Sequence, residues 1–271
     1  MTNRKAAAVK TASKPFLTGA PVDESTLKTS LVFFGSLILT ALMSFLVSAT
    51  TAGASLFIRV LLNGLMIPVI LFFFFNSGSS QGTDAVARGE ILYQRNEKGL
   101  TYTESEKSVC FHPVKGYLNG FFGTLPLFII AVMLSLLTGL QTTDSGTLPS
   151  WIQGYLRRDE VGAALVHYTQ PEGMGFVDYV RLIVRICIMP WINLAGAGNR
   201  QLMLVLERLS PLIVLLPAIS YGSGYLTGKS NRTRIHTAIS ESARKRARRE
   251  RKARKESRNG AIRPKGPQQL N

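Results

Sequence analysis

Residues 31–48 read LVFFGSLILTALMSFLVS, a stretch without a single charged side chain. Three more long apolar runs follow, at Ala54–Phe75, Phe121–Leu140 and Leu209–Leu226, and Arg59 is the only charge within any of them. A helix of about 20 residues crosses roughly 30 Å of hydrocarbon, so each run is long enough to span a membrane. Inside lipid the backbone must satisfy its own hydrogen bonds, and the runs lack the alternation of barrel strands. The sequence therefore predicts an all-α integral membrane protein with four transmembrane helices.

The apolar runs also predict how the chain is organised. The expected segments are a cytoplasmic N-terminal segment (1–28), a transmembrane helical hairpin (29–76), a cytoplasmic loop (77–116), a third transmembrane helix (117–140), an outer loop (141–203), a fourth transmembrane helix (204–228) and a polybasic cytoplasmic tail (229–271). Within the cytoplasmic loop we expect a short helix over Asp84–Asn96. A second helix should begin at Thr103, because Thr103 and Glu106 have the spacing of a capping box.

A fifth apolar stretch, Val177–Leu194, is harder to place because Asp178, Arg181 and Arg185 interrupt it. Its charge-free part is only as long as an interfacial or re-entrant segment. Arg181 and Arg185 are four residues apart and so share one helix face. The pattern predicts an amphipathic helix that lies on the outer leaflet with this face in water. A fifth span with two snorkelling arginines is the alternative.

The distribution of Lys and Arg predicts the orientation. With four spans, both termini share one side of the membrane with the 77–116 loop, and most of the basic residues lie there. Lys and Arg accumulate on the cytoplasmic side. We therefore expect both termini in the cytoplasm, most simply at the plasma membrane. Five spans would place the basic tail or the N-terminus outside, against this bias.

The tail is the most informative segment for function. Residues 229–265 contain 15 Lys/Arg against three Glu, which gives +12 of the net charge of +16. The segment lacks aromatic residues that could stack on bases, and it lacks a broad apolar face for insertion into lipid. Electrostatic attraction to anionic lipid headgroups is the first expectation, RNA or a ribosome the second, and a membrane-protein partner the third. The expected polyanion-binding residues are Arg244, Lys245, Arg246, Arg248, Arg249, Arg251, Lys252, Arg254 and Lys255.

Ionisable side chains near the spans are a second candidate site. Arg59 lies near the outer end of the second span and Glu207 at the outer end of the last. Charges in a membrane are by default a functional hypothesis, and an Arg59–Glu207 ion pair is one interpretation. Both residues are also close enough to the interface to snorkel. Asn63 could line a polar path or hydrogen-bond a neighbouring helix.

Two pairs of glycines have the spacing that lets helix backbones approach each other. Gly116 and Gly120 open the third span, and Gly224 and Gly228 close the fourth. Helix packing is the expected role of both pairs, with dimerisation as the alternative.

Patterns typical of catalysis or metal binding are absent from the sequence. The three histidines fall in different segments, and no nucleophile elbow, phosphate loop or zinc motif occurs. We therefore expect no enzyme activity, cofactor or metal. The expected function is a non-enzymatic membrane scaffold or accessory subunit whose basic tail contacts anionic lipid or another polyanion. The alternatives are a small transporter or channel-forming subunit, and a membrane-insertion or ribosome-docking factor.

Overall fold

The computed structural model describes residues 14–51, 54–139, 155, 158, 175–196 and 199–261. Its helices, in chain order, are α1 (Glu24–Thr50), α2 (Leu56–Glu97), α3 (Glu104–Ser108), α4 (Lys115–Leu137), α7 (Phe176–Cys187), α8 (Met189–Ala195), α9 (Arg200–Leu226) and α10 (Gly228–Ala261). Strands do not occur among these described residues. Most of the predicted outer loop, together with residues 1–13 and 262–271, lies outside the described part of the chain.

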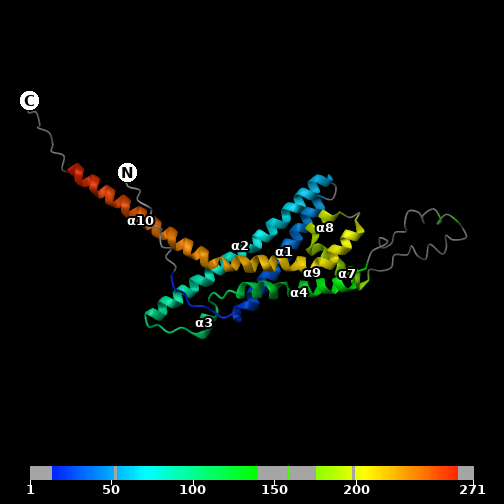
Figure 1. The fold of residues 1–271 in the computed structure, drawn as a ribbon, viewed down its shortest axis with the longest axis horizontal. Coiled ribbons are helices and arrows are strands. Elements are labelled where there is room, and N and C mark those ends of the chain that lie inside the picture. The colour runs from blue at the N-terminus through cyan, green and yellow to red at the C-terminus, as the bar shows by residue number, and fades with distance from the viewer. Residues whose placement is uncertain are drawn as a thin grey trace, which may run out of the picture.

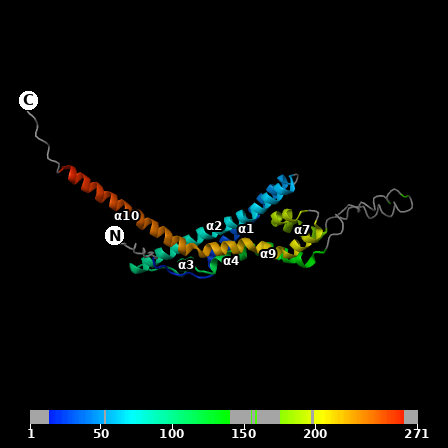
Figure 2. The same cartoon turned by 45° about the horizontal axis from the view of Figure 1, so that its top comes forward.

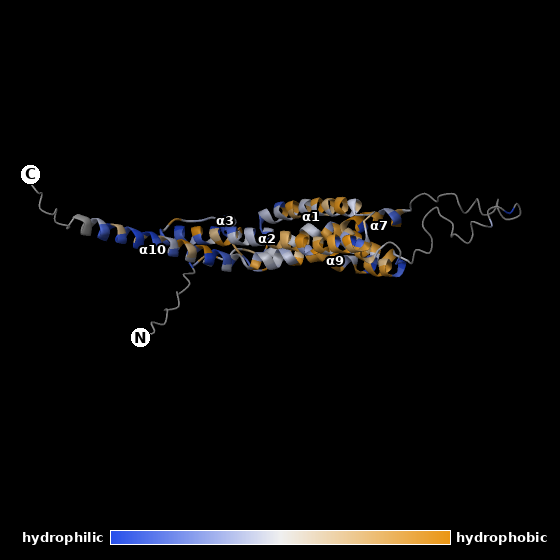
Figure 3. Cartoon of the chain, turned by 90° about the horizontal axis from the view of Figure 1, so that it is seen from above, coloured by the Kyte–Doolittle hydropathy of each residue, from blue (hydrophilic) through white to orange (hydrophobic). Residues whose placement is uncertain are grey.

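Four helices, α1, α2, α4 and α9, are long and apolar enough to cross a membrane. This confirms the predicted all-helical chain with four candidate spans. Figure 3 shows hydrophobic residues concentrated along the bundle, whereas α10 is largely hydrophilic. Large apolar side chains such as Leu31, Phe72, Leu136 and Leu212 are exposed on the spans. Such exposure is costly in water and ordinary in lipid, so it agrees with a membrane-embedded bundle.

The second span continues far beyond its apolar part. α2 has 42 residues, which corresponds to about 63 Å, roughly twice the hydrocarbon thickness. It ends only at Glu97, where Gly99 adopts a positive φ of 74° after the helix. Residues 84–96 are helical, as predicted, but they continue α2, so the predicted loop between residue 76 and that helix is wrong. The apolar run ends at Phe75, but packing against α9 and α10 keeps the following residues helical.

α9 lies at the centre of the bundle and packs along both α2 and α4 (Figures 1 and 2). One buried cluster joins Phe33 of α1, Phe74 of α2 and Tyr221 of α9, and the ring centroid of Phe33 lies 4.9 Å from that of Phe74. Polar bonds also link α9 to α2, because the Tyr221 hydroxyl donates to Gln81 Oε1 at 2.6 Å. The expected α1–α2 hairpin is only loosely packed, and α1 contacts α4 more extensively than it contacts α2.

The Val177–Leu194 stretch forms two short helices, α7 and α8, which bend at Ile188. Val180, Val184 and Ile188 pack into a buried cluster with α4 and α9. Arg181 is also buried, with 8% of its surface exposed. The expectation that the arginine face points into water is therefore wrong for Arg181. Whether the segment lies at a membrane interface stays a prediction.

The chain before α1 is built into the end of the bundle from which α10 leaves. Leu17 N donates to Gly89 O at 3.2 Å, and Gly19 N donates to Phe111 O at 3.0 Å. A Cβ on Gly19 would lie 2.3 Å from Cys110 O, so only glycine permits this approach. Nearby, α3 begins directly after Thr103, as the capping-box spacing predicted: Thr103 Oγ1 accepts from Glu106 N at 3.2 Å. This end of the molecule is therefore a packed layer and not a set of free loops.

Candidate polyanion-binding helix and its supports

α10 follows α9 after a single intervening residue, Thr227, and its first turns are bonded to α2. Asn231 Nδ2 donates to Ser79 Oγ at 2.6 Å, and Arg232 Nε donates to Glu90 Oε2 at 2.8 Å. His236 Nε2 lies 2.8 Å from Glu90 Oε1. Glu90 is only 4% exposed, so removal of its cationic partner would leave a poorly solvated carboxylate. These bonds hold the start of α10 at a defined angle to α2.

A second contact anchors the same part of α10 to the N-terminal segment. Lys229 Nζ lies 5.1 Å from the ring centroid of Phe16 and 5.6 Å from that of Phe111, within cation–π range. Residues 229–236 thus belong to the folded body. The division of the chain at residue 229 stays a prediction, but the sequence did not indicate that the first residues of the predicted tail pack on the bundle, because it did not show how far α2 extends.

Beyond this anchor the helix is exposed. Residues 241–257 are all exposed, and their Lys/Arg residues are the nine expected polyanion-binding ones. Lys252 and Glu256 form an i,i+4 pair at 3.8 Å, the only ion pair within this exposed stretch. At 3.6 residues per turn, seven of the nine cations fall within about 160° of the helix circumference. Arg246 and Arg254 lie outside this basic face.

The basic stretch is also remote from the bundle. Figures 1 and 2 show α10 running away from the four spans, with its C-terminal end far from them. α10 has 34 residues, a length of about 50 Å, and Arg244 lies about 24 Å along it from Gly228. The arrangement is a helical arm that is fixed at its N-terminal base and charged along its C-terminal half.

One interpretation of the sequence paired Glu207 with Arg59. In the structure Glu207 pairs instead with two arginines of α7. Arg185 Nε donates to Glu207 Oε1 at 2.8 Å, and Arg181 Nε lies 3.1 Å from the same oxygen. Thr138 donates its hydroxyl proton to the other carboxylate oxygen. Arg181 also pairs with Asp178 at 3.2 Å, so two carboxylates balance two guanidinium groups. The cluster joins the end of α4 to α7 and α9.

Arg59 lies apart from that cluster. Its Nε is buried and has no hydrogen-bond partner among the described residues. One turn further along α2, Asn63 is fully buried and bonded to three partners: its Oδ1 accepts from Ser48 Oγ at 3.0 Å and from Asn193 Nδ2 at 3.3 Å, and its Nδ2 donates to Arg59 O at 2.8 Å. This geometry is that of an interhelical hydrogen bond, the second of the two roles considered for Asn63.

The four glycines singled out from the sequence all lie at close helix contacts. A Cβ at Gly116 would lie 2.4 Å from Tyr225 Cβ, and one at Gly120 would lie 3.1 Å from Ala218 Cα. A Cβ at Gly224 would lie 2.0 Å from Phe75 O, and one at Gly228 would lie 2.3 Å from the carbonyl carbon of Gly82. The first pair thus allows α4 to approach α9, and the second allows α9 and α10 to approach α2.

Sequence reasoning missed the matching glycines on α2. A Cβ at Gly78 would lie 2.0 Å from Tyr221 O, and one at Gly82 would lie 2.2 Å from Tyr225 O. These residues have the same i,i+4 spacing as the other two pairs. The signal was present in the sequence, but it fell in a segment interpreted as a loop.

A buried ion pair supports the end of the bundle where α1 and α4 begin. Lys115 Nζ lies 2.6 Å from Asp23 Oδ2, and both side chains are at most 5% exposed. Burial opposes ionisation of Asp23, but hydrogen bonds from Lys115, Thr26 and Ser25 outweigh it and lower the pKa of Asp23 below its usual value. The pair locks the N-terminus of α1 to the N-terminus of α4.

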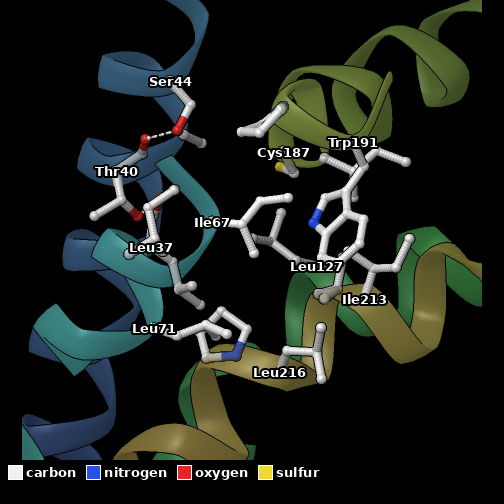
Figure 4. A pocket seen from close by; sticks show the side chains of 16 residues that line it. Leu37, Thr40, Ser44, Ile67, Leu71, Leu127, Cys187, Trp191, Ile213 and Leu216 are labelled. Atoms are coloured by element: carbon white, nitrogen blue, oxygen red, sulfur yellow. Dashed lines mark hydrogen bonds between the residues drawn. The ribbon is translucent and has the colours of Figure 1, made fainter. Parts of the chain in front are cut away.

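A largely apolar hollow lies between α1, α2, α8 and α9, and Figure 4 shows its walls. Leu37, Ile67 and Trp191 line it, and the Ser44 hydroxyl beside it donates to the Thr40 carbonyl of its own helix. Such a lining offers hydrocarbon contact and little that could recognise a polar substrate. Among the described residues, no group of three or more His, Cys, Asp or Glu side chains could hold a metal ion.

The chain matches no protein-family model, and comparisons with curated proteins and with solved structures found no significant match.

Proposed function

We propose that this protein is a non-enzymatic membrane scaffold that holds a polybasic helical arm, the outer part of α10, toward a polyanion on the cytoplasmic side. One observation carries the proposal: residues 241–257 are all exposed, they include nine Lys/Arg within Arg244–Lys255, and they follow a base that is bonded to the bundle. So concentrated a charge is destabilising by self-repulsion unless a counter-charge compensates it.

Electrostatics is the recognition that such an arm can provide. The described part of α10 contains no Phe, Trp or Tyr and no broad apolar face, and its one histidine is held by Glu90, so base stacking and deep insertion into lipid are both unsupported. Guanidinium and ammonium groups on one helix face can neutralise a row of phosphates and release their counterions. The partner is thus defined by its charge density and not by its sequence.

Because its base is anchored, the arm is better placed to bind a polyanion that approaches from solution than to bind the lipid headgroups of the membrane in which the protein sits. The surface potential of anionic lipid decays over a Debye length of about 8 Å at physiological salt. Arg244 lies about 24 Å along the helix from Gly228, so an arm held at an angle to the surface carries its basic face beyond that range. RNA, including the RNA of a docked ribosome, fits this geometry better than the headgroups beside the bundle.

Salt-dependent RNA binding by the full chain tests this proposal. The protein is placed in nanodiscs of zwitterionic lipid, and its affinity for a single-stranded RNA is measured from about 50 to 200 mM salt. The test variant replaces Arg244, Lys245, Arg246, Arg248 and Arg249 with Gln. We expect it to lose most of the binding and to reduce the slope of log K against log salt by about 3, because four of the five cations lie on the basic face and each phosphate contact to a single strand contributes about 0.7 to the slope.

A charge-preserving control uses the same positions. Lys at the four arginine positions of that set keeps the net charge, so a purely electrostatic arm should bind RNA nearly as well as before. Binding that ignores salt, or that survives the Gln substitutions, would contradict the proposal and indicate a specific protein-docking helix. Binding to anionic vesicles without binding to RNA would instead assign the arm to lipid.

Transport receives less support from the same structure. Two of the three polar residues considered for a path are satisfied within the bundle, since Asn63 bonds to Ser48 and Asn193, and Glu207 bonds to Arg181 and Arg185. The third is Arg59, whose Nε alone among these groups lacks a partner in the described residues. Paired in this way, Asn63 and Glu207 stabilise helix contacts and leave no row of free polar groups along the described spans.

A further inference from the structure

A polar pocket of about 450 Å³ opens at the end of the bundle where α1 and α4 begin. Side chains from α1, α2, α4 and α9 line it, among them Lys28, Asp84, Arg88, Lys115, Asn119 and Tyr225. It is separate from the basic stretch of α10, none of whose nine cations reaches it. We call it the α1–α4 pocket.

The charges around this pocket favour an anion. Lys28 and Arg88 are exposed, and neither forms an ion pair with another described residue. Lys115 is already neutralised by Asp23 at 2.6 Å. Asp84 is the single carboxylate in the lining, so the pocket retains one net positive charge. An occupant with one negative charge would leave it neutral.

The floor of the pocket contains polar groups without partners. Asn119 is 3% exposed and Tyr225 is 2% exposed. Asn119 Oδ1 and the Tyr225 hydroxyl have no hydrogen-bond partner in the described structure. Buried polar atoms are satisfied in the great majority of cases, so unsatisfied ones call for an explanation. A bound polar group that reaches the floor would provide their partners.

The pocket lies where the spans change from apolar to charged. In α1 the last charge before the apolar run is Lys28, and in α2 the first charge after the apolar run is Asp84. α4 begins at Lys115, directly before its own apolar run. For helices that cross a bilayer, this change marks the headgroup level, where lipid phosphates lie.

We propose that the α1–α4 pocket binds a phosphate ester, with Lys28 and Arg88 on the phosphate oxygens and with Asn119 and Tyr225 at the floor. A phosphodiester carries the single negative charge that the pocket lacks, and guanidinium and ammonium groups are its usual partners in proteins. Asp84 is left to accept a hydroxyl or ammonium donor from the same headgroup. The pocket's position at headgroup level makes a membrane phospholipid one source of this phosphate, and a soluble phosphate compound is the other.

Native mass spectrometry of the full chain in detergent, titrated with phosphatidylglycerol, tests the site. The starting protein carries Gln at the five tail positions 244, 245, 246, 248 and 249, so that α10 does not add lipid binding of its own. The test variant adds Lys28→Gln and Arg88→Gln, both at exposed positions. The control variant instead adds Lys98→Gln and Arg208→Gln, which remove the same charge from exposed residues outside the pocket.

We expect the Kd for phosphatidylglycerol to rise at least tenfold in the test variant and to stay unchanged in the control. Asp84→Asn should lower that Kd, because it removes the one negative charge of the lining and keeps an amide oxygen that can still accept the headgroup hydroxyl. A loss of folding cannot imitate this opposite effect. Diacylglycerol with the same chains should not bind, because it lacks the phosphate. Inorganic phosphate that displaces the lipid and binds as tightly would identify a soluble source, whereas failure to displace it would identify the lipid headgroup.

Three results would overturn the proposal. The first is that neither phosphatidylglycerol nor inorganic phosphate binds the starting protein. The second is a test variant that binds as tightly as the control. The third is equal binding of diacylglycerol, which would show that only the acyl chains are held.

Discussion

Replacing Glu207 with Gln should strongly destabilise the bundle, because it removes the central anion of a buried cluster. Arg181 Nε lies 3.1 Å from Glu207 Oε1, and the two side chains are 9% and 3% exposed. At an effective dielectric constant of 20, two unit charges at that distance attract by about 5 kcal/mol. Desolvation offsets part of this attraction, and breaking one side of a buried pair typically costs about 3–5 kcal/mol. For a chain of this size that corresponds to a fall in Tm on the order of 10 °C.

Thermal unfolding in detergent measures this loss. Trp191 packs against the buried apolar cluster of α4, α7 and α9, which adjoins the Glu207 ion pairs. Its fluorescence therefore reports on the packing of these three helices. A Trp151→Phe background makes Trp191 the only tryptophan, because the chain has two. The matched control is Glu97→Gln at the exposed end of α2, which removes the same charge and should leave Tm within about 1–2 °C.

A double-mutant cycle decides whether the ion pair is the cause. Arg181→Met combined with Glu207→Gln removes both charges, so the double variant should be less destabilised than the sum of the two single variants. A coupling energy of about 1–3 kcal/mol is expected for directly bonded partners. Strict additivity, or a loss of less than about 1 kcal/mol for Glu207→Gln alone, would refute this account of the cluster.

Three further outcomes are expected. Gly224→Ala should lower Tm, because its Cβ would lie 2.0 Å from the Phe75 carbonyl oxygen. Gly35→Ala is the control and should leave Tm equal or raise it, since nothing lies within 4 Å of that position. Equal effects of the two substitutions on Tm would contradict the packing argument. The pKa of Asp23 is lowered on folding, so its contribution to stability is present above about pH 4 and is lost as pH falls through the folded pKa. Unfolding midpoints from pH 6 to pH 3 should therefore fall less steeply in Asp23→Asn than in the unsubstituted chain, and parallel curves would count against this role. Tags at both termini should resist protease added outside intact cells. Cleavage of the C-terminal tag would contradict a cytoplasmic tail, and cleavage of that tag while the N-terminal tag stays protected would exclude an even number of spans.

The apolar runs determined the membrane-spanning helices from the sequence because the rule they obey is local. A run long enough to cross hydrocarbon must form its own backbone hydrogen bonds, wherever the rest of the chain lies. The charge of the tail was equally visible, since exposed Lys and Arg need no tertiary partner. The same reasoning failed for α2 after residue 76, where the apolar run ends and a loop was expected. Gly78 and Gly82 contact α9 closely, and this long-range packing keeps the segment helical.

Only the tertiary structure decided which charges meet. By sequence, Arg59 was the partner considered for Glu207 near the outer end of the bundle, and nothing local pointed to an arginine of the 177–194 stretch. Arg181 and Arg185 reach it because α7 folds back between α4 and α9, with Val180 and Val184 in the same buried cluster as Leu134. The start of α10 is a second case, since Arg232 and His236 looked like part of a free basic tail until α2 brought Glu90 to them. Ion pairs between residues far apart in the chain depend on how helices cross. The spacing of small residues indicates where a helix can be approached closely, but it does not say which helix approaches it.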